Sequence, residues 1–464
     1  MTSVIELCQV APPSCAADKL TLPLTCFDTL WILHNHRVPR ILFYELPIDK
    51  NSFIQNIIPT LKHSLSLTLK HYLPLAGNFV CAWNSSDYPE LRYEKGDSVS
   101  VIFSESDMDF DYLVGNDHPR NAKDFHPLVP ELAEPKDVSG VQFAPVLAIQ
   151  VTLFRNHGIS ICFITHHVIG DGSTIVAFIK SWALFNKYVG NEEQFLADHD
   201  EFIPFYDRSI VQDPYGQRYF LWDEMKKFKK KMSDVIVTPT PDPDPDNIVR
   251  CTFIIRRDDI KKLKNLILSR RPSLTHVTSY TVTSSYIWTC FIKSEDMIVG
   301  TEIIDENVME YFGCAVNYRE RFDPPLPSSY FGNCVIWYIA RTKHVDLVGN
   351  DGFTIAAESI GEIIHKRNKD KEYVLTGEWM KEVGAASKEG RYLAIAGSPK
   401  YDLYEADFGW GRPEKWDFLS LGTGLLMSLI KSKDDNGDLE IGLYLPKNRM
   451  NAFATIFTHG LSFL

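Results

Sequence analysis

Two runs of apolar, β-branched residues near the middle of the 464-residue chain constrain its fold most strongly. The runs, APVLAIQVTLF (144–154) and ISICFITHH (159–167), are separated only by RNHG. Runs of this length predict buried strands, and a short connection containing glycine predicts a hairpin between them. A glycine-flanked turn follows, and residues 173–190 then have apolar side chains at helical spacing. We therefore expect the hairpin to lead through a turn into a helix, capped by Ser173 and stopped by Gly190.

Helices and strands mix irregularly in the rest of the chain. Apolar residues recur at helical spacing in residues 51–77, and two further helices are expected at 258–270 and 447–464. The segment SYTVTSSYIWTCFIK (279–293) is apolar enough for a buried helix or strand, and Asn-Gly at 436–437 predicts the turn of a hairpin. Without regular strand–helix–strand alternation, the pattern predicts α/β or α+β layers.

A proline- and aspartate-rich segment, TPTPDPDPDN (238–247), interrupts this pattern after a basic run. Alternating proline and aspartate form neither helix nor sheet, so the segment is expected to be an extended linker. We expect an N-terminal lobe at residues 1–199, a crossover linker at 200–248 and a C-terminal lobe at 249–464.

Charge and cysteine usage narrow the class of protein. The formal net charge of −12 argues against a nucleic-acid partner, which would require a basic face. The nine cysteines form no C-x-x-C pair and most stand among apolar neighbours, as reduced buried thiols do. No secretory signal pattern and no run of 18 apolar residues is present. We expect a cytoplasmic protein that does not enter membranes.

The segment THHVIGDGST (165–174) carries the first candidate site. A neutral imidazole takes a proton well near neutral pH, and a strand end followed by glycines presents it rigidly to a ligand. Because side chains alternate along a strand, His166 and His167 are expected on opposite faces, so only one can face a given pocket. The alternatives are a structural histidine and an ordinary turn at Asp171. Metal binding is not expected, since adjacent histidines on opposite faces cannot share an ion.

A second motif, DFGWG, stands at residues 407–411. Asp-Phe-Gly occurs in protein kinases, but the chain has no G-x-G-x-x-G loop and no H-R-D sequence. It also lacks a Walker A sequence and the G-x-S-x-G elbow of serine hydrolases. These motif-based enzyme classes are therefore excluded.

The combination of His167-x-x-x-Asp171 with Asp-Phe-Gly-Trp-Gly at 407–411 resembles the plant BAHD acyl-CoA-dependent acyltransferases. A third stretch, YFGNC (330–334), is similar to a motif of the branch that acylates flavonoid and anthocyanin glycosides. The resemblance covers essentially the whole chain and is strongest to the phenolic glucoside malonyltransferases of nightshade plants.

This resemblance implies an α/β, two-lobed fold like chloramphenicol acetyltransferase, with mixed sheets and a channel between the lobes. His167 would be the general base that activates a sugar hydroxyl, the glucose 6-OH, toward the thioester of malonyl-CoA. Neither an acyl-enzyme, a bound cofactor nor a metal is implied, and the protein is expected to act as a monomer on a phenolic or flavonoid glucoside. Three alternatives stay open: a hydroxycinnamoyl donor, a catalytically silent relative that only binds CoA or glycosides, and an ester hydrolase using the same histidine.

The resemblance also implies structural roles for several motif residues. Asp171 would turn away from the histidine and form a salt bridge, within about 4 Å, with Arg319. Many relatives have aspartate where this chain has Asn317, so the surroundings of this pair are expected to differ. Asp407, Gly409 and Gly411 are expected to lock the structure rather than to take part in chemistry.

CoA carries phosphates, so an acidic protein must concentrate positive charge locally to bind it. The basic segment RRDDIKKLKNLILSRR (256–271) is one candidate, with a solvated helix face as its alternative. Two other stretches resemble family segments that border the CoA channel. The candidate CoA-binding residues are Lys264, Thr278, Ser279, Ser398 and Lys400.

A malonyl donor needs a cation for its free carboxylate, ideally arginine. Some malonyltransferases have this arginine shortly after the histidine motif, in D-A-S-T-R, where this chain has Ile175. Arg37 or Arg40 could replace it, although surface arginines are the simpler interpretation. Trp31 lies in a stretch that often borders the acceptor mouth, and an aromatic glucoside would rest on such a surface.

Overall fold

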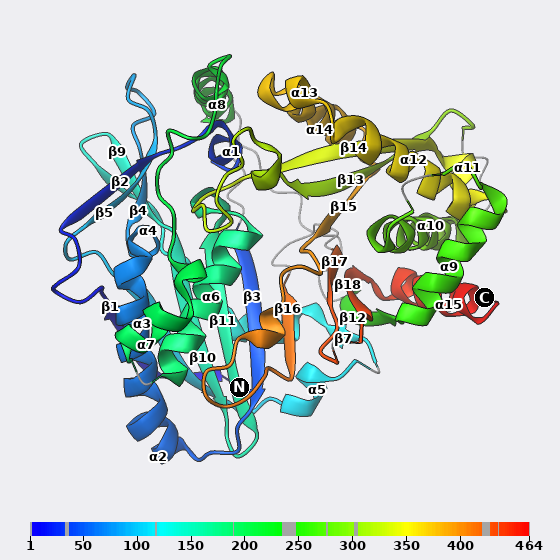
Figure 1. Ribbon diagram of the computed structural model, residues 1–464. Coiled ribbons are helices and arrows are strands. Elements are labelled where there is room, and N and C mark those ends of the chain that lie inside the picture. Colours follow the sequence, from blue (N-terminus) through cyan, green and yellow to red (C-terminus); the bar gives the residue numbers. More distant parts are fainter. Residues whose placement is uncertain are drawn as a thin grey trace.

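The chain is described from a computed structural model that covers residues 2–32, 37–116, 118–188, 190–233, 247–274, 277–300, 305–419, 427–434 and 436–463. Three mixed or antiparallel sheets with helices packed around them form two lobes (Figure 1). The α/β class expected from the sequence is confirmed.

The first lobe is built on a six-stranded sheet. In spatial order its strands are β1 (Thr2–Val10), β6 (Val99–Ser106), β10 (Leu147–Phe154), β11 (Gly158–His166), β3 (Arg37–Glu45) and β16 (Lys415–Phe418). β10 and β11 pair antiparallel from Leu147 opposite Thr165 to Phe154 opposite Gly158, so the predicted hairpin is confirmed. Both strands are buried along their whole length, which explains why their sequences are continuously apolar.

The second lobe is built on a seven-stranded sheet. In spatial order its strands are β14 (Val335–Lys343), β13 (Met309–Asn317), β15 (Tyr392–Ala396), β17 (Met427–Lys431), β18 (Leu439–Pro446), β12 (Ile248–Ile255) and β7 (Arg120–Asn121). The predicted C-terminal hairpin corresponds to β17 and β18. A third, five-stranded sheet flanks the first lobe and consists of β2 (Lys19–Pro23), β5 (Glu90–Glu94), β4 (Asn78–Cys81), β9 (Val141–Pro145) and β8 (Lys136–Val138).

Helices cover the first sheet on both faces. One face packs against α3 and α6, and the other packs against α5 and η2, with a separate apolar cluster on each face. The helical elements of this part of the chain are α1 (Cys26–Thr29), α2 (Lys50–Ser52), η1 (Phe53–Ile57), α3 (Ile58–His71), α4 (Leu73–Ala76), α5 (Phe110–Val114), η2 (Ala122–Leu128), η3 (His167–Ile169), α6 (Gly172–Lys187), α7 (Glu192–Asp198), η4 (Asp200–Phe202) and α8 (Gln217–Ser233).

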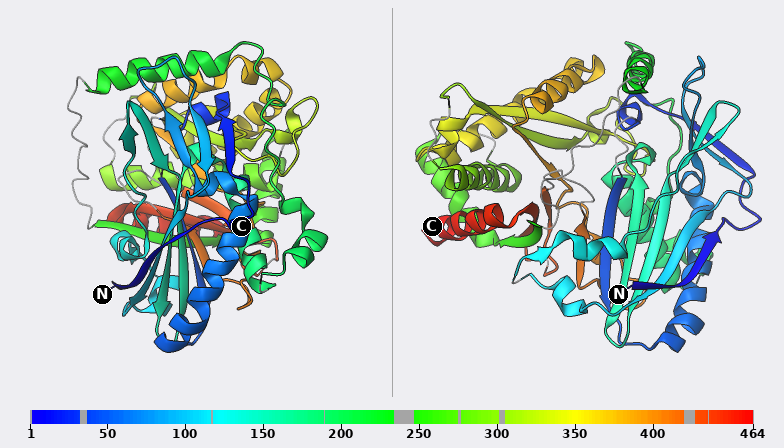
Figure 2. Two further views of the ribbon diagram at one scale, coloured as in Figure 1. Left: turned by 90° about the vertical axis from the view of Figure 1, so that its left-hand side faces the viewer. Right: turned by 180° about the vertical axis from the view of Figure 1, so that it is seen from behind.

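Helices α9, α10, α12 and α15 gather around the second sheet, as the turned views also show (Figure 2). The helical elements of this lobe are α9 (Arg257–Arg270), α10 (Ser279–Val299), η6 (Arg319–Arg321), α11 (His344–Val348), α12 (Gly352–Arg367), α13 (Lys371–Leu375), α14 (Glu378–Lys388), η7 (Leu403–Glu405) and α15 (Lys447–Ser462). The segment that the sequence left open between helix and strand is therefore the helix α10.

Several expected helices are confirmed, with one correction at a cap. The helix after the turn is α6, but its N-cap is Asp171, whose side chain accepts hydrogen bonds from the backbone N–H groups of Ser173 and Thr174. Ser173 is therefore the second helical residue, because aspartate accepts from two free N–H groups at this end. The basic run inside the expected linker is part of α8, and residues 238–246 of the proline-rich segment lie outside the described residues.

Each lobe receives one strand from the other half of the sequence. β16, from the C-terminal half, pairs with β3 and completes the first sheet, and β7, from the N-terminal half, pairs with β12. The division at residues 199 and 248 stays a prediction.

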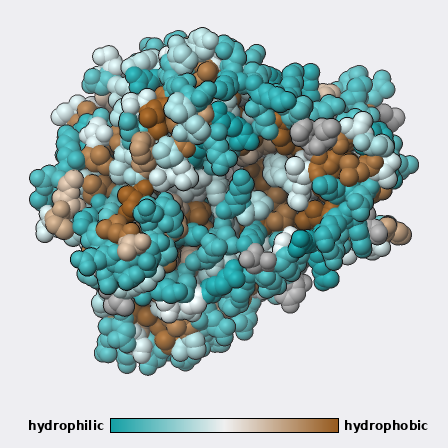
Figure 3. Space-filling model, viewed as in Figure 1, coloured by the Kyte–Doolittle hydropathy of each residue, from teal (hydrophilic) through white to brown (hydrophobic). Residues whose placement is uncertain are grey.

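The face shown in Figure 3 is mainly hydrophilic with small apolar patches. Within the described segments, no helix is long and apolar enough to cross a membrane.

Candidate active site

The two adjacent histidines lie on opposite sides of the backbone where β11 ends. His166 is buried, its ring stacks on Phe79, and its Nδ1 accepts a hydrogen bond from the Val168 N–H at 3.2 Å. His167 begins the short helix η3 and is only half-buried. The alternation predicted from the strand therefore holds, and His167 is the histidine that keeps some exposure.

The imidazole of His167 lies flat on the indole of Trp31. The ring centroids are 3.6 Å apart and the planes differ by 14°. Trp31 follows α1, whose N-terminus is fixed by a capping box in which Asp28 accepts hydrogen bonds from the Thr25 N–H and hydroxyl at 2.8 and 2.7 Å. The stack fixes the plane of the imidazole and places the predicted acceptor residue Trp31 directly against the predicted base.

Asp171 forms the expected salt bridge with Arg319. Nη1 and Nη2 of the guanidinium donate to the two carboxylate oxygens at 2.7 and 3.1 Å, and the exposed fractions of both side chains are 2% or less. The carboxylate also accepts hydrogen bonds from the backbone N–H groups of Ser173, Thr174 and Cys334. Both of its oxygens are therefore satisfied by α6 and by the second lobe.

The charge of Asp171 outweighs the effect of burial on Arg319. Burial by itself lowers the pKa of the guanidinium, but the opposing carboxylate raises the pKa above its ordinary value. Asn317, the departure noted in the sequence, accepts from the Arg319 backbone N–H at 3.1 Å and donates to Ser173 Oγ at 3.2 Å. It thus extends the contact between the lobes without a second negative charge.

The stretch YFGNC joins the lobes directly behind the histidine turn. Asn333 Nδ2 donates to the carbonyl oxygen of His167 at 3.0 Å and to Asp28 Oδ1 at 2.9 Å. The carbonyl oxygen of Gly332 accepts from Thr174 Oγ1 at 3.0 Å and from Arg319 Nη2 at 3.0 Å. This motif therefore fixes the backbone that carries the imidazole.

Asp28 is the residue of this region that sequence reasoning missed most clearly. It is fully buried, and it pairs with Arg208 as well as bonding to Asn333. Only its position three residues after Thr25 could have indicated a capping role. Arg208 lies in the expected linker, and no local sequence signal marks it as a partner.

The DFGWG motif lies at the other end of α6. Asp407 Oδ1 accepts from the backbone N–H groups of Gly409 and Gly411 at 2.8 and 2.9 Å, and its Oδ2 accepts from Lys187 Nζ at 2.8 Å. Both glycines have φ near +90°, which favours glycine over other residues. Lys187 is the last residue of α6, about 22 Å from its first residue along a helix of this length. The motif shapes a turn far from His167.

The candidate CoA-binding residues fall into two groups. Lys264 is exposed on α9. This helix lies at the outer side of the second lobe, away from α6 (Figures 1 and 2), so the structure does not bring it to the histidine turn. Thr278 is the N-cap of α10, and Ser279 is its first residue; both are exposed. Ser398 and Lys400 lie in the loop of residues 397–401 that follows β15.

The loop of residues 397–401 approaches the start of α6. A Cβ atom placed on Gly172 would lie 2.6 Å from Tyr401 Cε2, so the tyrosine ring packs directly on this glycine. Ser173 Oγ donates to the Tyr401 hydroxyl at 3.1 Å. Ser398 and Lys400 are therefore carried close to the turn that presents His167, and Tyr401 is a further neighbour that the sequence did not indicate.

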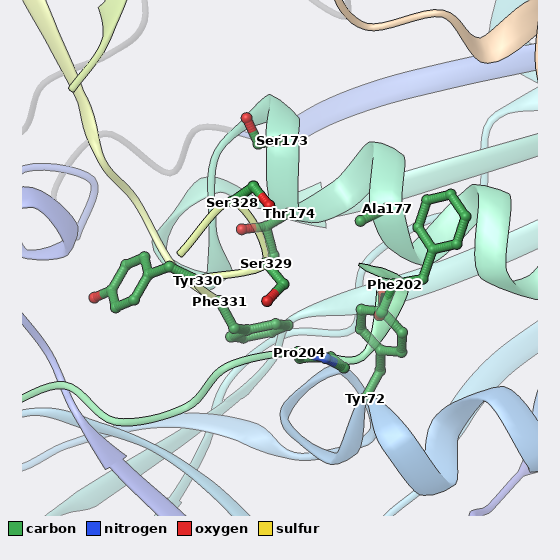
Figure 4. Close-up of a pocket in the computed structure, with 10 residues that line it drawn as sticks. All are labelled: Tyr72, Ser173, Thr174, Ala177, Phe202, Pro204, Ser328, Ser329, Tyr330 and Phe331. Atoms are coloured by element: carbon green, nitrogen blue, oxygen red, sulfur yellow. Dashed lines mark hydrogen bonds between the residues drawn. The ribbon is translucent and has the colours of Figure 1, made fainter. Parts of the chain in front are cut away.

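A shallow crevice lies on another side of the same helix turn. Figure 4 shows Ser173 and Thr174 at its upper side, the rings of Tyr72 and Phe331 below them, and the ring of Phe202 at the right beside Ala177. His167 does not line this crevice. The crevice is therefore a feature of the contact between α6 and the YFGNC segment and is separate from the site around His167.

The two candidate donor-binding arginines differ in environment. Arg37 is half-buried, and its Nη2 donates to Glu134 at 3.4 Å. Arg40, three residues on, is 3% exposed and lies on the face of β3 that packs against α6. The surface interpretation is therefore wrong for Arg40, because β16 and β11 cover its strand on both sides. Among the described residues, no cluster of His, Cys, Asp or Glu is arranged to hold a metal ion.

Comparisons with known proteins agree with this geometry. A family model described as the transferase family matches residues 4–459. The chain belongs to this family, the BAHD acyltransferases. It is 64% identical to phenolic glucoside malonyltransferase 1 of Nicotiana tabacum, covering 100% of both chains, and 40% identical to a malonyl-coenzyme:anthocyanin 5-O-glucoside-6'''-O-malonyltransferase of Salvia splendens, covering 98% of this chain and 95% of the relative.

The fold matches that of a solved structure. Vinorine synthase superposes with a TM-score of 0.69 at 18% identity, covering 97% of this chain and 96% of the other. At this identity the likeness concerns the fold alone, and it confirms the two-lobed α/β architecture expected for a BAHD acyltransferase.

Proposed function

We propose that this BAHD acyltransferase transfers the malonyl group of malonyl-CoA to a sugar hydroxyl, the glucose 6-OH, of a phenolic or flavonoid glucoside. One observation carries the chemistry: the half-buried imidazole of His167 is held flat on Trp31 at the end of a buried strand. The 64% identity over the full length with a phenolic glucoside malonyltransferase supports the choice of donor and acceptor.

In this reaction His167 is the general base. A ring nitrogen takes the proton of the sugar hydroxyl as its oxygen attacks the thioester carbonyl carbon. The tetrahedral intermediate then collapses, the carbon–sulfur bond breaks, and the proton passes to the CoA thiolate. Acyl transfer is direct, so no acyl-enzyme forms. A positioned base contributes about 10²- to 10⁴-fold to the rate, and alignment of two bound substrates adds to this.

The environment of His167 differs from that of a Ser-His-Asp triad. In a triad the aspartate accepts a hydrogen bond from the imidazole and orients it. Here the carboxylate of Asp171 is occupied by Arg319 and by backbone N–H groups. Orientation of the imidazole is instead assigned to the Trp31 stack and to the hydrogen bond from Asn333 to the His167 carbonyl.

The thioester is proposed to reach His167 along the loop of residues 397–401. Ser398 and Lys400 in this loop are polar, and Tyr401 anchors the loop on the first turn of α6. Thr278 and Ser279, at the exposed N-terminus of the long helix α10, are suited to a phosphate, because free N–H groups gather there. The aromatic acceptor is proposed to enter beside Trp31. The enzyme is proposed to act as a cytoplasmic monomer.

A donor competition tests this proposal. Wild-type protein receives a phenolic glucoside with an equimolar mixture of malonyl-, acetyl- and coumaroyl-CoA, and the products are resolved by mass. We expect predominantly malonylated glucoside, which His167→Ala abolishes. His157→Ala is the matched control, because His157 is exposed in the turn at the opposite end of β11 and should leave turnover unchanged.

Each other outcome contradicts a specific part of the proposal. A coumaroylated product would keep the base and change the donor. Incubation of the malonylated glucoside without any CoA thioester tests the hydrolase alternative, since release of malonate there would indicate a hydrolase. No transfer from any donor would favour a protein that only binds CoA or glycosides.

A further inference from the structure

Arg40 is a buried arginine with very few partners. It is 3% exposed, and its Nη1 donates a long hydrogen bond of 3.4 Å to Thr165 Oγ1. Its guanidinium lies over the ring of Phe418 at 5.2 Å, and its Nε has no acceptor. Across the described segments, no acidic side chain forms an ion pair with it. A buried cation of this kind is unusual, because buried charges are normally paired.

Three other buried arginines of the same molecule follow the usual rule. Arg208 pairs with Asp28, Arg250 pairs with Asp417, and Arg319 pairs with Asp171. Each of these pairs joins two elements of the fold and has an evident structural role.

Arg40 also remains a cation. Burial lowers the pKa of its guanidinium to about 10, and the nearby Tyr401 and Asp171 partly oppose this effect. At neutral pH the group is therefore positively charged inside the protein. An anion that reached it would relieve the cost of leaving this charge unpaired.

The place of Arg40 is next to the reaction centre. Its hydrogen-bond partner Thr165 stands two residues before His167 on β11, a separation of about 7 Å along a strand. Phe418, on which the guanidinium lies, contacts the loop of residues 397–401: a Cβ on Gly397 would be 2.8 Å from the Phe418 ring. Arg40 thus lies between the histidine turn and the loop along which the thioester is proposed to arrive.

We propose that Arg40 binds the free carboxylate of the malonyl group and selects malonyl-CoA over neutral acyl-CoA donors. This inference rests on the proposed function. In malonyl-CoA a single methylene separates the carboxylate from the thioester carbonyl, so the residue that binds it must lie close to the base. Arginine suits this role, since its planar fork matches a carboxylate.

The other candidate positions are occupied differently. Ile175, where some malonyltransferases have arginine, is fully buried in the apolar core under α6. Arg37 already donates to Glu134 and is only half-buried, at the end of β3 that pairs with His166. Arg40 is the candidate whose charge is both buried and left for a ligand.

The test measures donor choice within one protein preparation. Arg40→Gln removes the charge but keeps a long polar side chain. We expect the ratio of kcat/KM for malonyl-CoA to that for acetyl-CoA to fall about 10- to 100-fold, the usual weight of charged hydrogen bonds. Because both donors are measured on the same preparation, a smaller folded fraction cancels from the ratio. Arg40→Lys keeps the positive charge without the planar guanidinium, so its donor ratio should lie between those of wild type and Arg40→Gln.

A matched control and a binding measurement complete the experiment. Arg155→Gln replaces an arginine at the far end of the β10–β11 hairpin that pairs with Glu105, and its donor ratio should equal that of the wild type. Titration without acceptor should show that malonyl-CoA binds wild type more tightly than acetyl-CoA does, and that this difference is lost in Arg40→Gln while the affinity for free CoA is kept.

The outcomes separate this inference from the proposed function. If wild type shows no malonyl transfer, the proposed function fails. If wild type prefers malonyl-CoA and Arg40→Gln keeps the same preference, the assignment of Arg40 alone is overturned. A shift in donor ratio for Arg37→Gln but not for Arg40→Gln would likewise overturn it and place the carboxylate at the end of β3 that pairs with His166.

Discussion

Arg319 donates from Nη1 and Nη2 to the two carboxylate oxygens of Asp171, at 2.7 and 3.1 Å. This bidentate ion pair connects the start of α6 to the second lobe. The pair is almost fully buried. Because Asp171 stands four residues after His167, the placement of this proposed base depends on a contact between the lobes. Asp171 therefore acts on the imidazole through the backbone rather than through a hydrogen bond.

Removal of one partner of this pair should destabilise the whole protein. We expect Arg319→Met to lower the free energy of unfolding by about 3–5 kcal/mol, because the Asp171 carboxylate stays buried without its cation. Chemical denaturation measures this loss. Lys261→Met is the control, since the pair of Lys261 with Asp258 is exposed to solvent and should contribute little to stability. Equal losses of unfolding free energy in the two variants would show that the ion pair of Arg319 with Asp171 does not stabilise the fold.

The Trp31 platform should matter for turnover more than for stability. We expect Trp31→Ala to lower kcat for malonyl transfer about tenfold or more, because the imidazole loses the surface that fixes its plane. Trp31→Phe keeps an aromatic face and should retain most of the activity. Steady-state kinetics on both variants, with circular dichroism as a check of folding, measure this. Phe220→Ala, an exposed aromatic position on α8, is the control. Equal loss in the Ala and Phe variants would contradict stacking as the cause.

The local features of this fold could be read from the sequence. Strands β10 and β11 have continuously apolar sequences because they are buried on both faces, and the turn after them has the glycines that such a turn needs. The salt bridge between Asp171 and Arg319 followed from the resemblance, and the structure contains it. The cap of α6 was misassigned to Ser173, because Asp171 serves as cap and as ion-pair partner at once.

Features that depend on which strands become neighbours could not be read in this way. Arg40 looked like a surface residue, yet β16 crosses from the C-terminal half to pair with β3 and puts Phe418 beneath its guanidinium. The contact of Asp28 with Asn333 likewise joins residues 305 positions apart. Neither pairing leaves a periodic pattern in the sequence, since each is set by tertiary packing.

Gly332 should not tolerate a side chain. Its φ of +141° is unfavourable for other residues, and a Cβ there would lie 3.1 Å from Arg208 Nη2. We expect Gly332→Ala to lower the free energy of unfolding by about 1–3 kcal/mol, as strained backbone positions do. In Gly384→Ala the new methyl group meets open space inside the helix α14, so this control should instead gain about 0.5–1 kcal/mol. Denaturation curves of both variants measure these changes. An unchanged unfolding free energy in Gly332→Ala would show that the backbone of the YFGNC segment accommodates the methyl group.

The buried pair of Lys415 and Glu440 should give the protein a pH-dependent stability. Lys415 Nζ donates to Glu440 at 2.6 Å and to Asn116 at 3.0 Å, and burial lowers its pKa from the usual 10.5 to about 8. Between these two values the unfolded chain holds a proton that the folded protein has released, so stability contributed by this group rises with pH. We expect the unfolding free energy of wild type relative to Lys415→Met to increase by about 1–3 kcal/mol from pH 8 to pH 10.5. Cysteines and tyrosines also titrate in this range, but they are common to both proteins and cancel in the difference. A difference that stays constant or falls with pH would show that Lys415 keeps its proton in the folded state.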